Sequence, residues 1–183
     1  MKYVYCLALL LLTTQCVMAQ NESEASLCRL ETKYDRATDT TTVGCDLFES
    51  YKDRLRFQVR INVSFQGKEA NETAKFSLAL SSYKGDATRK TLPLFKDAVT
   101  LALSADPAQF ELPISGYQKD FFEMNRMLAE LARAELGRED LRRLLAAQSL
   151  AGKWGGAEFK LSGAALKALK EFISHQAFTT DGR

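Results

Sequence analysis

Histidine is almost absent from this sequence, since His175, near the C-terminus, is the only one. A Ser-His-Asp or Cys-His catalytic arrangement would have to use that residue. His175 falls near the end of a predicted terminal helix, a poor position for a rigid catalytic group, and we interpret it as a surface residue. The sequence also lacks a Gly-x-Ser-x-Gly elbow, a phosphate-binding loop, a dinucleotide fingerprint and a His-Glu-x-x-His motif. We therefore predict no metal or cofactor site and consider an enzyme the less favoured class.

Proline and glycine are too scarce for a low-complexity linker, with 3 and 10 residues among 183. Hydrophobic residues make up 46% and charged residues 26% of the chain, which is typical of a globular protein with one core. An excess of one charge is also lacking, because the formal net charge is only +2. Proteins that bind nucleic acid usually have a basic surface, so we predict no nucleic-acid partner. The composition indicates a single globular domain, which we place at residues 20–183.

Residues 1–19 are typical of a signal peptide. Lys2 precedes an apolar run from Val4 to Leu12, and Val17-Met18-Ala19 has small or slim residues at the positions that a signal peptidase reads. The run is well short of the ~20 apolar residues that span a bilayer, so an uncleaved anchor is the less favoured alternative. No later segment is apolar enough to span a membrane. We predict cleavage after Ala19 and a periplasmic or secreted domain.

Export decides how the cysteines are interpreted. Cys6 and Cys16 leave with the signal peptide, so the mature domain keeps only Cys28 and Cys45. Two cysteines in an oxidising compartment most simply form one disulfide, and we predict this pairing. A hairpin of residues 27–34 and 40–47 would place the two cysteines, and likewise Leu30 and Val43, directly opposite each other.

Three asparagines, Asn21, Asn62 and Asn71, lie in N-glycosylation sequons. They would matter in a eukaryotic secretory protein, whereas in a bacterium the motifs would be accidental. Both interpretations stay open at this stage.

The clearest structural signal runs from Arg54 to Phe65. Every second position is apolar, and polar residues fill the positions between them. Successive side chains of a strand point to opposite faces, so this alternation predicts a strand with one buried and one solvent-facing side. Weaker signals predict further strands at residues 74–82, 91–95, 98–103 and 110–114. A sheet with one face in water is typical of antiparallel pairing.

The hydrophobic period changes after Gly116. Apolar residues at three- and four-residue steps predict an amphipathic helix over residues 120–136 and a second helical stretch around residues 141–145. Charged residues of both signs in this region, Glu130 among them, are interpreted as a solvated helix face. Gly155-Gly156 predicts a tight hairpin, and Ser162 predicts the start of a final helix. The fold class that follows is α+β, an antiparallel β-sheet with C-terminal helices packed on one face.

Trp154 is the only tryptophan and lies beside the predicted hairpin turn. Such a side chain can stack on a sugar or a base, but next to a tight turn it more often packs in the core. We therefore predict a core position.

The closing strand has the sequence Glu-Phe-Lys-Leu-Ser-Gly over residues 158–163 and precedes a leucine-rich helix. A strand-rich N-terminal part, a helix and this closing segment resemble uncharacterised exported bacterial domains that contain a similar F-x-L-S segment. The resemblance covers roughly the last two-thirds of the chain. It implies no activity and no site residues.

Arg54, Arg56 and Arg60 fall at even spacing on the polar side of the first strand described above. Arginine is well suited to bidentate contacts with carboxylate or phosphate groups. One interpretation is a solvated sheet face balanced by acids on neighbouring strands. The other is a docking surface for an anionic partner, such as an acidic protein patch or an anionic envelope polymer.

Two hypotheses about function remain. The favoured one is a non-catalytic exported binding or interaction module of the cell envelope or extracellular space. The alternative is a small hydrolase that uses two carboxylates in a sheet cleft. No pair of acids stands out in the sequence, so no catalytic residue is assigned.

Overall fold

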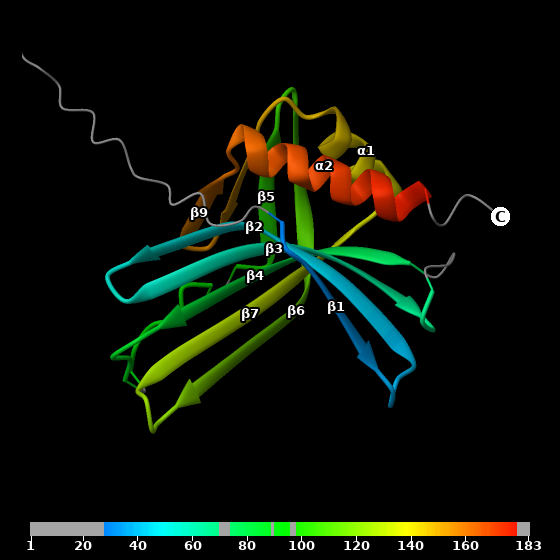
Figure 1. Cartoon of the computed structure of the whole chain (residues 1–183). Helices are drawn as coiled ribbons and strands as arrows, with labels where there is room; N and C mark the ends of the chain where they lie inside the picture. The colour runs from blue at the N-terminus through cyan, green and yellow to red at the C-terminus, as the bar shows by residue number, and fades with distance from the viewer. Residues whose placement is uncertain (1–27, 70–73, 89, 96–97, 179–183) are drawn as a thin grey trace, which may run out of the picture.

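The computed structural model describes residues 28–69, 74–88, 90–95 and 98–178, and it is dominated by β-structure (Figure 1). The elements in chain order are β1 (Leu30–Asp35), β2 (Thr40–Lys52), β3 (Leu55–Gln66), β4 (Lys75–Lys84), β5 (Thr100–Ala105), β6 (Ala108–Phe122), β7 (Met127–Leu136), α1 (Arg138–Ala146), β8 (Leu150–Trp154), β9 (Ala157–Lys160) and α2 (Gly163–Phe178). The signal peptide, Asn21 and Asn71 lie outside the described residues.

The described strands form one curled antiparallel sheet in the order β1-β2-β3-β4-β7-β6-β5-β8-β9. The connection from β4 to β5 therefore passes two other strands. The long strand β6 serves both halves of the sheet, because Ala108–Pro113 pairs with β5 and Ile114–Phe122 pairs with β7. Pro113 lies where one ladder ends and the other begins, a position that suits a residue without a backbone N–H to donate.

The fold class is mostly β, so the prediction of a balanced α+β fold is confirmed only for its antiparallel sheet. The helix predicted over residues 120–136 is wrong, because this region is the hairpin of β6 and β7. Leu128, Ala132, Ala134 and Leu136 lie at even positions of β7 and are buried. Pairing with β4 on one side and β6 on the other overrides the helix propensity of a segment rich in alanine, leucine and glutamate.

The strand predicted from Arg54 to Phe65 is confirmed by β3, whose apolar positions from Phe57 to Phe65 are buried, with Ile61 at the centre. The strand predicted at residues 74–82 is β4, whereas the one predicted at residues 91–95 is absent. Residues 91–93 have no regular structure, and the next two residues form a turn held by side-chain contacts described below.

Both C-terminal elements predicted from turn and cap residues are confirmed. In the β8–β9 hairpin Gly152 pairs with Phe159 and Lys153 with Glu158. The Ser162 hydroxyl accepts a hydrogen bond of 3.2 Å from the backbone N–H of Ala165 and so caps α2. The apolar stripe of α2 is buried, and this helix contacts β2 and α1.

The disulfide between Cys28 and Cys45 is present, with an S–S distance of 2.06 Å. The predicted register of the first hairpin was two residues off, because Leu30 rather than Cys28 lies opposite Cys45. Cys28 precedes β1 in the left-handed conformation, at φ 59°. Its N–H donates to the carbonyl of Asp46 at 3.3 Å, which brings its side chain back to β2.

Trp154 lies in the core, as predicted, and is only 1% exposed. Its ring stacks on Phe95 with a centroid distance of 3.9 Å, and its indole N–H donates to the carbonyl of Ala98 at 3.0 Å. The β8–β9 hairpin is therefore fixed directly to the connection between β4 and β5.

Among the described residues, no helix has the length and apolarity needed to cross a membrane.

Candidate functional site

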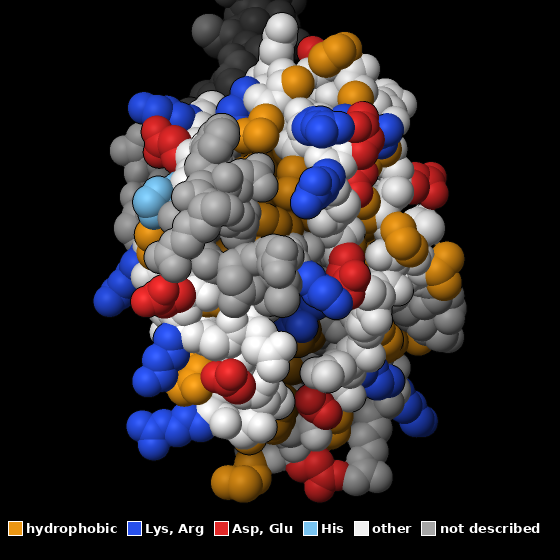
Figure 2. All heavy atoms as spheres, turned by 90° about the vertical axis from the view of Figure 1, so that its right-hand side faces the viewer, with side chains coloured by type: hydrophobic (Ala, Val, Ile, Leu, Met, Phe, Trp, Pro, Cys, Tyr) orange, Lys and Arg blue, Asp and Glu red, His pale blue; other side chains and the backbone are white. Residues whose placement is uncertain are grey.

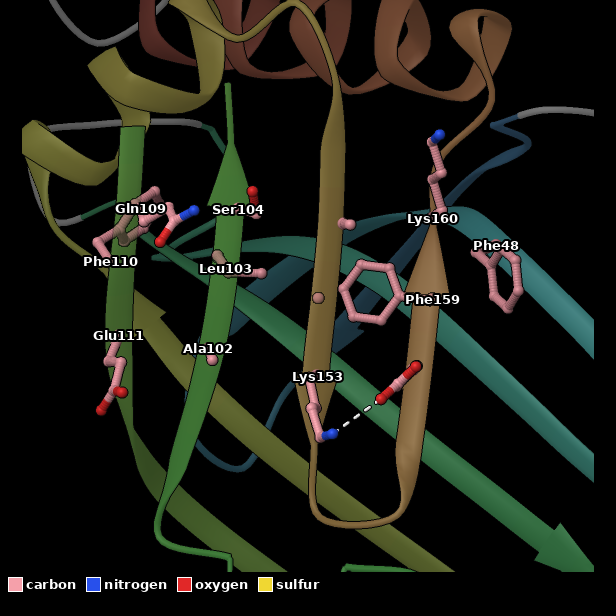
Figure 3. A pocket seen from close by; sticks show the side chains of 13 residues that line it. Phe48, Ala102, Leu103, Ser104, Gln109, Phe110, Glu111, Lys153, Phe159 and Lys160 are labelled. Carbon is pink, nitrogen blue, oxygen red and sulfur yellow. Dashed lines mark ion pairs between the residues drawn. The ribbon is translucent and has the colours of Figure 1, made fainter. Parts of the chain in front are cut away.

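A broad, open depression of about 880 Å³ lies over β6, β5, β8 and β9 (Figure 3). Its lining residues are Phe48, Ala102, Leu103, Ser104, Gln109, Phe110, Glu111, Ala151, Gly152, Lys153, Glu158, Phe159 and Lys160. Figure 3 shows the four strands side by side, with Phe48 of β2 beyond the free edge of β9.

The hollow arises from the order of small and large side chains across the strands. Ala102 on β5 lies between Glu111 on β6 and Lys153 on β8. Ser104, the next residue on the same face, lies between Gln109 and Ala151. Residues paired across strands project side by side from one face of a sheet. Strand β5, together with Ala151 of β8, therefore supplies a floor of small side chains. The longer side chains of β6, of β9 and of Lys153 on β8 supply the walls.

The other face of the same strands is closed by aromatic residues. A Cβ added at Gly152 would overlap the ring of Phe159, so this position has to be glycine if the ring is to lie across β8. Phe159 is buried, and its ring centroid lies 6.2 Å from that of Phe48 and 6.3 Å from that of Phe57. Phe48 itself is half-buried. An apolar group thus lies next to the free edge of β9.

The wall at β8 and β9 contains an ion pair between Lys153 and Glu158, with 2.9 Å between ammonium and carboxylate. The hydrogen bond from Lys153 and its positive charge lower the pKa of Glu158, and the same contact with Glu158 raises the pKa of Lys153. Lys160 and Glu111, at opposite corners of the depression, are exposed and have no ion pair within the described part of the chain. The depression therefore has one neutralised pair and two separate charges of opposite sign.

The two acidic residues of the depression, Glu111 and Glu158, lie on its two outer strands, and Glu158 already forms an ion pair with Lys153. Glu111 and Glu158 are separated by Ala102 and Lys153, which makes three strand spacings. At about 4.8 Å per spacing the backbones of the two residues are about 14 Å apart. Acid pairs that hydrolyse glycosidic bonds lie roughly 5–9.5 Å apart. Over the described ranges, no three His, Cys, Asp or Glu side chains come together in a way that could hold a metal ion.

The prediction for Glu130, a solvated helix face, is wrong, because this residue lies on β7 and is buried. It is 3% exposed rather than part of a solvated helix face. Its carboxylate accepts hydrogen bonds from the hydroxyls of Ser82 and Tyr117, both at 3.0 Å, and from the backbone N–H groups of Leu94 and Phe95, at 2.7 and 3.1 Å. Glu130 thus fastens the turn between β4 and β5 to the sheet. Alternation with Leu128 and Ala132 was the signal that could have revealed it.

A smaller open hollow of about 390 Å³ lies at the far end of β6 and β7. It is lined by Thr88, Thr91, Lys119, Phe121, Glu123 and Leu128. The hydroxyl of Thr91 already has a partner within the loop, because it accepts a hydrogen bond of 2.7 Å from the backbone N–H of Thr88.

The arginines on the polar side of β3 are each matched by acids. Arg60 contacts Glu31 at 2.6 Å and Asp46 at 3.5 Å. Arg56 forms an ion pair with Glu49 of β2, and Arg54 forms one with Asp86 in the turn after β4. Arg54 lies in the turn before β3, and so only two of the three arginines belong to the strand. Figure 2, which shows the side at the right of Figure 1, has basic and acidic side chains intermixed. These contacts favour the solvated, acid-balanced interpretation of this face.

Asn62 lies in the middle of β3 and is only 8% exposed. Its side-chain oxygen accepts a hydrogen bond of 3.2 Å from the guanidinium of Arg60. In the folded protein the side chain of Asn62 is therefore not accessible to a glycosyltransferase.

Comparisons with known protein families, with curated proteins and with solved structures found no match.

Proposed function

We propose that this protein is a non-catalytic, exported binding module that holds a partner protein or an envelope component in the depression over β6, β5, β8 and β9. One observation carries the proposal: the floor of small side chains, Ala102, Ser104 and Ala151, between walls of long polar ones. Such a hollow admits an incoming chain, and its walls offer charges and hydrogen-bonding groups that orient it.

Export is supported by the Cys28–Cys45 disulfide, because disulfides persist mainly in oxidising compartments. We further take α1 and α2 to pack on the core side of the sheet, as the sequence predicts. The burial of the apolar residues of α2 in one core with β3 supports this arrangement. It would leave the opposite face of the four strands open to a partner.

The alternative, a small hydrolase with two cooperating carboxylates, finds no support in this depression. The backbones of Glu111 and Glu158 lie three strand spacings apart, about 14 Å, with Ala102 and Lys153 between them. Glu158 is moreover engaged by Lys153, and Glu130 is buried outside the depression.

The test replaces small side chains on the floor of the depression by large ones. The domain of residues 20–183 is immobilised and used to capture partners from the envelope fraction, and the Kd of each captured partner is then measured. Ser104→Arg and Ala151→Arg should weaken binding by at least about tenfold, because their side chains occupy the hollow. Thr100→Arg is the matched control, since Thr100 is exposed on the same face of β5 but does not line the depression.

The proposal is wrong if both floor variants, correctly folded by circular dichroism, bind the captured partner as tightly as the wild type. It is also wrong if Thr100→Arg weakens binding as much as the floor variants do.

A further inference from the structure

Among the described residues, the edge strand β9 has backbone groups that no other strand pairs with, and they lie beside the depression. It is the last strand of the described sheet, with β8 on one side only. The N–H of Leu161 donates to the carbonyl of Leu150 at 2.9 Å, which marks these two residues as a hydrogen-bonded pair. Hydrogen-bonded pairs recur at every second residue of an antiparallel ladder. Phe159 and Ala157 therefore direct their backbone groups to β8, whereas Glu158 and Lys160 direct theirs away from the sheet.

An apolar surface lies against this edge. Phe48 is half-buried, and its ring lies 6.2 Å from the ring of Phe159, measured between centroids. Figure 3 shows Phe48 on the side of β9 that faces away from β8. A strand added to β9 would place every second side chain over this aromatic pair, on the face of Phe159.

The remaining side chains of an added strand would lie on the face of Glu158 and Lys160. Glu158 is already neutralised by Lys153, at 2.9 Å. Lys160 is exposed and has no ion pair in the described part of the chain. The charge that β9 offers to a neighbour is therefore positive.

From these three features we propose that the partner of the proposed binding site is a polypeptide segment that adds to β9 as an extended strand. Its side chains alternate between apolar residues, which contact Phe48 and Phe159, and acidic residues, which contact Lys160. In this type of recognition the main-chain hydrogen bonds supply affinity and the alternate side chains supply specificity. The inference rests on the proposed function, because it names the class of partner that would bind at the wall of the depression formed by β9.

The other edge strand, β1, is a weaker template for the same contact. All of its residues are exposed, so this strand itself offers an added strand no half-buried apolar side chain. Its Lys33 nevertheless gives a matched control, as an exposed lysine on an edge strand.

The experiment selects binders from a displayed library of short random peptides on the domain of residues 20–183. The selected peptides should alternate acidic and apolar residues, and a synthetic peptide of the consensus sequence is then the probe. Lys160→Pro removes an outward N–H without touching the ladder to β8, and it should weaken binding by at least about tenfold. Lys160→Glu should do the same by repulsion, whereas Lys33→Glu should leave the Kd unchanged.

Three outcomes overturn the inference: no enrichment of any peptide, enriched peptides without the alternation, or equal affinity of the wild type and a folded Lys160→Pro variant. A concentration-dependent dimer that Lys160→Pro dissolves would identify a second copy as the occupant instead. The two proposals fail separately. If Ser104→Arg abolishes capture of an envelope partner while Lys160→Pro leaves it intact, the depression binds, but without strand addition.

Discussion

Glu130 and Phe95 are joined by a hydrogen bond of 3.1 Å, from the backbone N–H of Phe95 to the carboxylate of Glu130. Phe95 in turn stacks on Trp154 of β8 at 3.9 Å. The carboxylate on β7 thus fixes the turn that supports the β8–β9 hairpin. This hairpin forms one wall of the depression. The buried carboxylate of Glu130 therefore helps to position that wall.

Replacing Glu130 by leucine should lower the free energy of unfolding by about 3–5 kcal/mol. The change removes the acceptor of four hydrogen bonds and leaves the donors of Leu94 and Phe95 buried without a partner. Denaturant unfolding of the two proteins measures the difference. Glu135→Leu, at an exposed position of the same strand, is the control and should change stability by less than about 0.5 kcal/mol. Equal losses would show that the hydrogen bonds of Glu130 contribute nothing specific.

The sequence predicted those elements whose determinants lie within the element itself. Strict alternation identified β3, and Gly155-Gly156 identified the hairpin of β8 and β9. The β6–β7 hairpin was missed because its local composition favours a helix, whereas its structure depends on pairing with β4, which is distant in sequence. The first hairpin was misregistered because the cysteines were assumed to lie directly opposite each other, whereas Cys28 lies outside its strand.

The depression could not be predicted at all. Ala102, Ser104 and Ala151 are unremarkable small residues in the sequence, and they form a floor only because β5 lies between β6 and β8. That order depends on the connection from β4 to β5, which passes β7 and β6. No local pattern encodes such a crossing, since it is decided by long-range burial.

Processing is expected to leave Gln20 as the first residue. The spacing of small residues at Val17 and Ala19 matches the positions that a signal peptidase reads. The intact mass of the exported protein measures this directly. A mature chain that retains Met1 would contradict the signal peptide.

Loss of the disulfide should destabilise the domain by about 2–4 kcal/mol, because the bridge restricts the unfolded chain between Cys28 and Cys45. Cys28→Ser and Cys45→Ser should have similar effects, and adding a reductant to the wild type should reproduce them. Non-reducing peptide mapping checks the pairing itself. Two free thiols in the exported protein would refute it.

Lys153→Gln should raise the pKa of Glu158 towards its ordinary value. In the wild type the hydrogen bond and the charge of Lys153 lower this pKa. A carboxyl group whose pKa is lowered on folding stabilises the protein above its unfolded pKa, and that contribution is lost as the pH falls through the folded pKa. NMR titration of the Glu158 side chain measures the shift. Both groups are exposed, so high salt should reduce the difference between wild type and variant.

On the polar side of the sheet, the side chain of Arg60 packs directly over Gly44. A Cβ added at Gly44 would overlap the guanidinium of Arg60, which lies across β2 to reach Glu31 on β1. Gly44→Ala should therefore cost about 1–3 kcal/mol, because the arginine is displaced from its acids.

In an Arg60→Ala background the same change should cost less than about 1 kcal/mol, since the side chain that it displaces is gone. Denaturant unfolding of the wild type, both single variants and the double variant gives the coupling energy between the two positions. Additive effects would show that the position of the Arg60 side chain does not depend on a glycine at residue 44. Arg60 would then be held by Glu31 and Asp46 no more firmly than an ordinary surface side chain. A clear coupling would mean that β2 carries a glycine at this point so that Arg60 can tie β3 to β1 across it.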